Sequence, residues 1–175
     1  MRPRKVKGVD PEGSLIAGAE RIVAVRLDEL CGFAPKVFDP EEVEALHDMR
    51  IAAKRLRYVL EVTGELFGAY ADEARKRTKE LQELLGDIHD CDVLVPRVLA
   101  LLEDLRTEDV AAVVAGGEPP HADEYRGLEM LIVTTRARRV QLFERFLAFW
   151  TDLERDGFRA RLEYAIEERS EEAAA

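Results

Sequence analysis

The sequence lacks the features of a membrane protein, of a disulfide-stabilised secreted domain and of a general nucleic-acid binder. No apolar run approaches the roughly 18 residues that a membrane span requires. The two cysteines, Cys31 and Cys91, form no CxxC pair or other metal-ligand spacing, which is typical of reduced thiols in a cytoplasmic protein. The formal charge of −10, with 36 acidic against 26 basic residues, disfavours general binding to nucleic acid. Any anion site must therefore be local.

The chain organisation predicts one domain with short tails. The basic start, MRPRKVKGVDPEGS, lacks the apolar segment of a secretory signal peptide. A chain of 175 residues that is 47% apolar can build one core. We expect a flexible basic arm over residues 1–13, a single helical domain over residues 14–170 and a frayed C-terminus over residues 171–175.

Bounded alternating strands are missing, whereas apolar residues recur at spacings of three and four through most of the chain. This pattern predicts an all-α protein, a compact antiparallel bundle of about six helices. The expected helices cover about 14–30, 39–63, 72–85, a segment beginning near 90, about 123–153, and a last segment beginning near 156.

Local signals predict three of the helix boundaries. Asp39 is a suitable N-cap for the second helix, and Pro40 suits its first turn. Gly86 is expected to break or bend the third helix. The segment AGGEPPH, residues 115–121, is the clearest loop.

A cationic stripe lies beside the apolar face of the second expected helix. It spans a sector of roughly 80° and about 15 Å, at spacings of three, four and three residues, and consists of His47, Arg50, Lys54 and Arg57. Arg55 points elsewhere. Like charges at these spacings repel by a few tenths of a kcal/mol per pair. The stripe therefore predicts either acids on a neighbouring helix or a bound anion, for which Arg offers a planar fork and Lys a point charge.

The first and third helices carry weaker versions of this arrangement. Arg75, Lys79 and Gln82 line up beside the apolar face of the third helix, and Arg26 flanks that of the first. Nearby acids in the third helix also allow a simple solvated face.

The long C-terminal helix carries an arginine near the middle of its apolar stripe. This residue is Arg139, and Arg136 lies at the edge of the stripe. Because burying an unpaired guanidinium is prohibitively costly, Arg139 must meet a carboxylate, an anion or a wet cavity.

The histidines allow a metal site as an alternative. The candidate ligands belong to two His-Asp pairs and one further acid: His47, Asp48, His89, Asp90 and Asp92. However, adjacent residues on a helix point roughly 100° apart, and only three histidines occur. We expect no metal, no cofactor and no catalytic residues.

Two segments together resemble the signature of the CHAD family, the conserved-histidine α-helical domain. They are LHDMRIAAKRLRYVLE and KELQELLGDIHDCDVL. The resemblance implies a helical bundle with a basic groove or channel that binds inorganic polyphosphate and locates to its granules. The family motif carries binding roles to His47, Arg50, Lys54, Arg57, Lys79 and, at a lower rank, Arg55.

The helical-wheel argument adds four candidates to those of the motif: Arg26, Arg75, Arg136 and Arg139. The sequence thus favours a non-catalytic binder of polyphosphate or another phosphate-rich anion, without a specific nucleic acid or membrane partner and with self-association left open. A metal-dependent His-Asp phosphohydrolase is the first alternative. A protein-interaction bundle with internally paired charges is the second.

Overall fold

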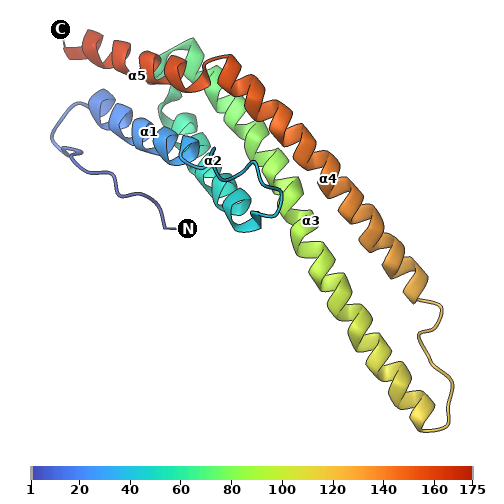
Figure 1. Ribbon diagram of the computed structural model, residues 1–175. Coiled ribbons are helices and arrows are strands. Elements are labelled where there is room, and N and C mark those ends of the chain that lie inside the picture. Colours follow the sequence, from blue (N-terminus) through green and yellow to red (C-terminus); the bar gives the residue numbers. More distant parts are fainter. Residues whose placement is uncertain (1, 175) are drawn as a thin grey trace. The chain divides into compact units, whose positions relative to one another are not determined.

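The computed structural model describes residues 2–174, and side chains for residues 2–169 (Figure 1). Within this part the chain forms helices and turns and no strand. The elements are α1 (Leu15–Cys31), α2 (Val43–Thr63), the 3-10 helix η1 (Gly64–Phe67), α3 (Ala69–Val114), α4 (Tyr125–Arg155) and α5 (Phe158–Ala174). The all-α prediction is confirmed, and the expected number of helices was close.

The apolar faces predicted for α1 and α2 are buried. Val23, Leu27 and Leu30 of α1 are fully buried, and so are Met49 and Leu56 of α2. The helical period therefore placed these side chains on the correct side. The cationic stripe, which lies beside the buried face of α2, is positioned by the same packing.

The predicted start of α2 was wrong. The helix begins at Val43, and residues 39–42 form a turn instead. The Asp39 side chain accepts a hydrogen bond from the backbone N–H of Glu41 at 2.9 Å. This local bond is the kind by which Asp favours a turn over a helix.

The predicted break at Gly86 was also wrong, because α3 continues through both Gly86 and Pro96. Gly86 lies between the buried residues Leu85 and Ile88. A Cβ on Gly86 would lie 3.5 Å from Nε of Arg50. This position of α3 thus packs against a side chain from α2. Packing of this long helix offsets a cost of about 1 kcal/mol for glycine and about 3 kcal/mol for proline.

The chain divides into two compact units, residues 1–86 with 145–175, and residues 87–144. In the first unit, α1 packs against both α2 and α5. In the second, Val98, Leu102 and Ile132 form a buried apolar cluster. The boundary between the units falls within α3 and α4. The single domain expected over residues 14–170 stays a prediction.

The two predicted tails differ in what the structure describes. In the N-terminal segment, the guanidinium of Arg4 lies 2.7 Å from the carboxylate of Asp28. The flexibility expected for this arm stays a prediction. A frayed end was expected over residues 171–175. The side chains of these residues and the backbone of Ala175 lie outside the described part of the chain.

Candidate functional site

The α2 stripe consists of His47, Arg50, Lys54 and Arg57, and its residues share one edge of α2. Three of them are half-buried, whereas Lys54 is exposed. The ammonium of Lys54 lies 5.8 Å from the centre of the Tyr58 ring, and the guanidinium of Arg57 lies 4.5 Å from it. Tyr58 thus holds two cations of the stripe near each other.

Arg50 is the least satisfied cation of the stripe. Its Nε is buried and has no hydrogen-bond partner in the described part of the chain. No carboxylate among the described residues comes within ion-pair distance of Arg50. A buried polar group without a partner costs about 1–3 kcal/mol. An anion that reached the Arg50 guanidinium would supply an acceptor that the described residues do not.

Arg57 is satisfied only in part. Its Nη1 lies 3.2 Å from the carboxylate of Glu61, one turn further along α2. Its Nε, however, is buried without a hydrogen-bond partner among the described residues. Arg50 and Arg57 therefore each have a side-chain Nε–H without an acceptor among the described residues.

The contact between Arg50 and Gly86 identifies which face of α3 lies next to the α2 stripe. The two residues lie about equally far from the turn around Gly68, so α2 and the first part of α3 run antiparallel. Because both helices rise by about 1.5 Å per residue, Lys54 comes level with Gln82, and Arg57 with Lys79. Gln82 also has a buried side-chain oxygen without a partner in the part described.

Gln82 and Gly86 were not predicted as site residues. Gln82 had been placed beside Lys79 by its spacing, but a neutral amide gives no charge signal. In the sequence, Gly86 indicates a break or bend of the helix and not a binding role. Both depend on which helix lies opposite, which a single helical wheel does not show.

The two predicted cations of the first part of α3 are held by acids of the same helix. Arg75 donates to Asp72 at 2.7 Å, and Lys79 lies 3.7 Å from Glu83. Lys79 is 52% exposed and its partner 64%, so this ion pair is weak. The ammonium of Lys79 can therefore turn to another anion at little cost.

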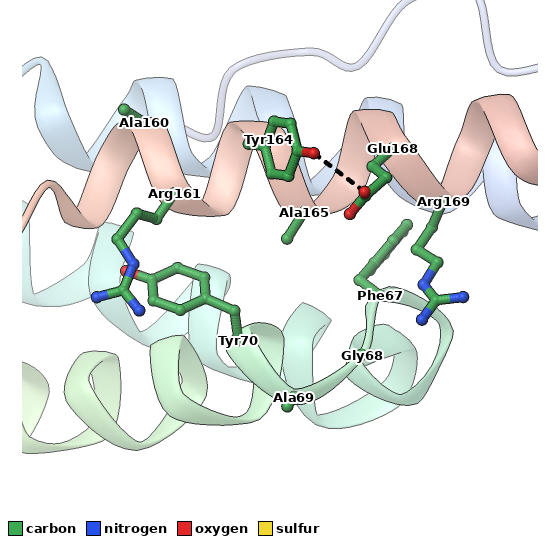
Figure 2. Close-up of a pocket in the computed structure, with 10 residues that line it drawn as sticks. All are labelled: Phe67, Gly68, Ala69, Tyr70, Ala160, Arg161, Tyr164, Ala165, Glu168 and Arg169. Atoms are coloured by element: carbon green, nitrogen blue, oxygen red, sulfur yellow. Dashed lines mark hydrogen bonds between the residues drawn. The ribbon is translucent and has the colours of Figure 1, made fainter.

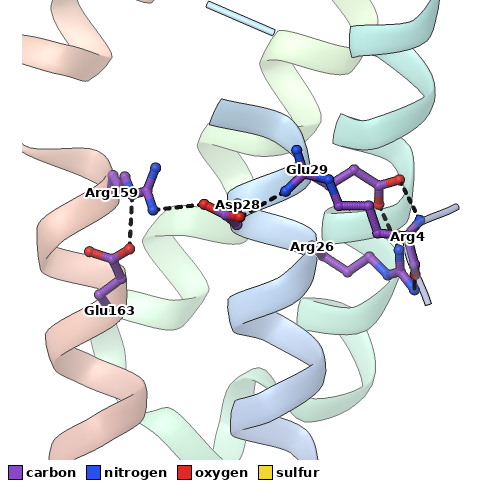
Figure 3. A network of polar contacts seen from close by, with 6 residues as sticks. All are labelled: Arg4, Arg26, Asp28, Glu29, Arg159 and Glu163. Atoms are coloured by element: carbon purple, nitrogen blue, oxygen red, sulfur yellow. Dashed lines mark hydrogen bonds and ion pairs between the residues drawn. The ribbon is translucent and has the colours of Figure 1, made fainter. Parts of the chain in front are cut away.

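Arg26 and Arg55 converge on one buried carboxylate instead of joining the α2 stripe. They lie 2.6 Å and 2.9 Å from the two oxygens of Glu29, which is 2% exposed. The backbone N–H of Arg4 also donates to Glu29, and Figure 3 shows Arg4 and Arg26 gathered at this carboxylate. These contacts join α1, α2 and the N-terminal segment, which is a structural role.

Arg136 and Arg139 belong to the second unit. Arg139 Nε donates to Asp92 at 2.9 Å, and both side chains are 14% exposed. The sequence required a carboxylate, an anion or a wet cavity beside Arg139, and the structure has the carboxylate of Asp92 there. Arg136 is exposed. The predicted site residues are thus divided between the units, with eight in the first unit and these two in the second.

The metal alternative gains no support from the geometry. Within the described residues, no group of three or more His, Cys, Asp or Glu side chains gathers as a metal site would require. One of its proposed ligands, Asp92, is taken by Arg139. A carboxylate that is already held in a half-buried ion pair is a poor candidate for a metal ligand.

A pocket of about 440 Å³ with two further arginines lies between α5 and the start of α3 (Figure 2). The guanidinium of Arg161 lies 4.2 Å from the centre of the Tyr70 ring at one end, and Arg169 lies beside Gly68 at the other. Burial raises the pKa of the Tyr70 hydroxyl, and Arg161 opposes this rise. These two arginines do not stand out in the sequence, because their helix shows no cationic row.

Comparison with known proteins gives one match. The model of a protein family described as "CHAD domain" matches residues 7–99, which is 93 of the 175 residues. No curated protein and no solved structure matches the chain. In the described part, none of the helices combines the length and apolar character needed to cross a membrane.

Proposed function

The chain belongs to the CHAD domain family, and from this premise we propose that it binds inorganic polyphosphate without catalysing a reaction. CHAD domains are known as a polyphosphate-binding family. The site of the proposal is the α2 stripe with Gln82 and Lys79 of α3. A linear polyanion would receive several charge-assisted hydrogen bonds there at once.

The observation that carries this proposal is the buried Nε of Arg50, which has no hydrogen-bond partner in the described part of the chain. Arg50 lies within a row of cations and packs beside Gly86 of α3. A guanidinium held in place without a carboxylate suits a phosphate oxygen, because its planar fork matches that geometry. The exposed Lys54 next in the row gives a chain of phosphates access from solvent.

The decisive test compares two arginine variants in a titration with polyphosphate. Arg50→Ala should lower the affinity by about tenfold or more, the effect of losing one hydrogen bond between charged groups. Arg155→Ala removes the same charge from an exposed position, 69% accessible, at the end of α4, and should leave the affinity nearly unchanged. Equal effects of the two variants would contradict a specific stripe.

The interaction-bundle alternative is favoured by two contacts. Arg57 pairs with Glu61, and Arg139 pairs with Asp92, as internally paired charges require. Arg50 and Lys54 show no such ion pair within the described residues. If polyphosphate fails to bind at low salt, the alternative with paired charges becomes the better account.

The remaining parts of the proposal concern catalysis and location. Incubation of purified protein with polyphosphate, with and without a divalent metal, should release no phosphate. Release that depends on the metal would favour the His-Asp phosphohydrolase.

We further propose a cytoplasmic protein at polyphosphate granules. A fluorescent fusion should coincide with the granules, and Arg50→Ala should disperse it.

A further inference from the structure

A second pocket of the first unit lies between the end of α1, the end of α4 and the start of α5. Its volume is about 460 Å³, which is within the range of about 300–1,000 Å³ that small-molecule sites occupy. It shares no residue with the α2 stripe. The residues that line it are Cys31, Ala34, Trp150, Leu153, Glu154, Gly157, Phe158, Arg159, Ala160 and Glu163.

The walls of the pocket are largely apolar and rigid. Trp150, Leu153 and Phe158 are each at most 5% exposed, so their positions are fixed by the core. The indole N–H of Trp150 donates to Glu154 at 2.9 Å, which orients this carboxylate. Gly157 turns the chain between α4 and α5 with a φ of +70°, a conformation that suits glycine.

The rim of the pocket carries more acids than bases. Arg159 is the cation of the lining, and it donates to Asp28 and to Glu163, each at 2.8 Å (Figure 3). Together with Glu154, the lining thus holds two carboxylates and one guanidinium, whereas Asp28 lies outside the lining and is also paired with Arg4 at 2.7 Å. The two acids of the lining keep lone pairs free after these bonds, because a carboxylate accepts about four.

The thiol of Cys31 contributes an uncharged surface. Burial raises its pKa to about 11, with Arg159 opposing this rise and the carboxylates of Glu163, Asp28 and Glu154 adding to it. The thiol therefore stays protonated near neutral pH. A protonated thiol behaves as a small apolar group and is a poor nucleophile.

We propose that this pocket binds a small organic cation, an ammonium group on a compact apolar body. The apolar body would lie against Trp150, Leu153 and Phe158, and the ammonium would donate to Glu154 and Glu163. An anion is disfavoured by the excess of carboxylates. This site has the opposite charge preference from the α2 stripe and does not depend on polyphosphate binding.

The test uses the fact that Trp150 is the only tryptophan of the chain. Its fluorescence should change in a saturable way with 2-phenylethylammonium. The neutral analogue 2-phenylethanol should bind about tenfold more weakly, as expected from the loss of one charge-assisted hydrogen bond. No saturable change, or equal affinities for the two compounds, would overturn the proposal.

Three variants locate the effect. Glu163→Gln should weaken binding of the ammonium several-fold, whereas Glu167→Gln, an exposed change on the same helix, should not. Ala34→Leu should fill the pocket and abolish binding. Retained affinity in both Ala34→Leu and Glu163→Gln would contradict the assignment.

Discussion

Arg50 and Gly86 form the contact on which the proposed site depends. The distance of 3.5 Å between Nε of Arg50 and the position of a Cβ on Gly86 is an ordinary van der Waals separation. An alanine therefore fits, whereas a longer side chain would push Arg50 out of place.

Substitution of Gly86 separates helix stability from binding. Gly86→Ala should raise the free energy of unfolding by about 0.5–1 kcal/mol, because alanine loses less backbone entropy in a helix. Its affinity for polyphosphate should stay near that of the original protein. Gly86→Leu should keep the helix and weaken binding. Urea unfolding and a polyphosphate titration measure the two effects, and a loss of stability in Gly86→Ala would contradict the continuous α3.

Glu29 has the opposite character, because it is buried and fully engaged. Removing it would leave Arg26 and Arg55 without their carboxylate. Glu29→Ala should therefore lower the free energy of unfolding by about 3 kcal/mol. Glu167→Ala, an exposed change on α5, should stay within about 0.5 kcal/mol in the same urea experiment. Similar losses in the two variants would show that the ion pairs have no special role.

At the scale of elements, the connection between α3 and α4 is held by a polar cluster. Asp109 is 6% exposed, and it accepts hydrogen bonds from the backbone N–H of His121 and from the hydroxyl of Tyr125. The imidazole of His121 lies between Glu108 and Glu124, at 3.0 Å and 3.3 Å. The loop between α3 and α4 is thus held by hydrogen bonds to residues of both helices and of the loop itself.

This cluster makes the loop sensitive to pH. The hydrogen bonds with Glu108 and Glu124 raise the pKa of His121 above its ordinary value of 6.5. A raised folded-state pKa stabilises the loop fully below pH 6.5, and this contribution disappears as the pH rises through the folded-state pKa. Hydrogen exchange, corrected for its intrinsic rate, should show more protection of residues 115–124 at about pH 6 than at about pH 9. His121→Gln should remove this difference, and an unchanged difference would contradict it.

At the scale of the whole molecule, a net charge of −10 repels polyanions at a distance. Binding then depends on a local row of cations whose partners are few. The pairs of Arg26 and Arg55 with Glu29, and of Arg139 with Asp92, remove three predicted candidates from easy access to an anion. The remaining candidate residues of the first unit are concentrated along the α2 stripe and at Lys79 and Gln82 of α3.

The salt dependence of polyphosphate binding reports how many phosphates this row neutralises. The logarithm of affinity should fall linearly with the logarithm of salt concentration, with a slope of roughly −0.7 per contact if polyphosphate resembles single-stranded nucleic acid. Arg50→Ala should reduce the slope by about one contact, and Arg155→Ala should not change it. Binding that does not respond to salt would exclude the proposed mechanism.

The sequence by itself determined the all-α class, the buried faces of α1 and α2 and the row of cations on α2. These features follow from the spacing of side chains along a single helix, which is a local property. Only the tertiary structure decided which cations meet acids. It paired Arg55 with Glu29 and Arg139 with Asp92, and it left Nε of Arg50 buried beside Gly86. Such choices depend on which helices lie opposite one another, and a buried charge or glycine in the sequence is compatible with several partners until packing selects one.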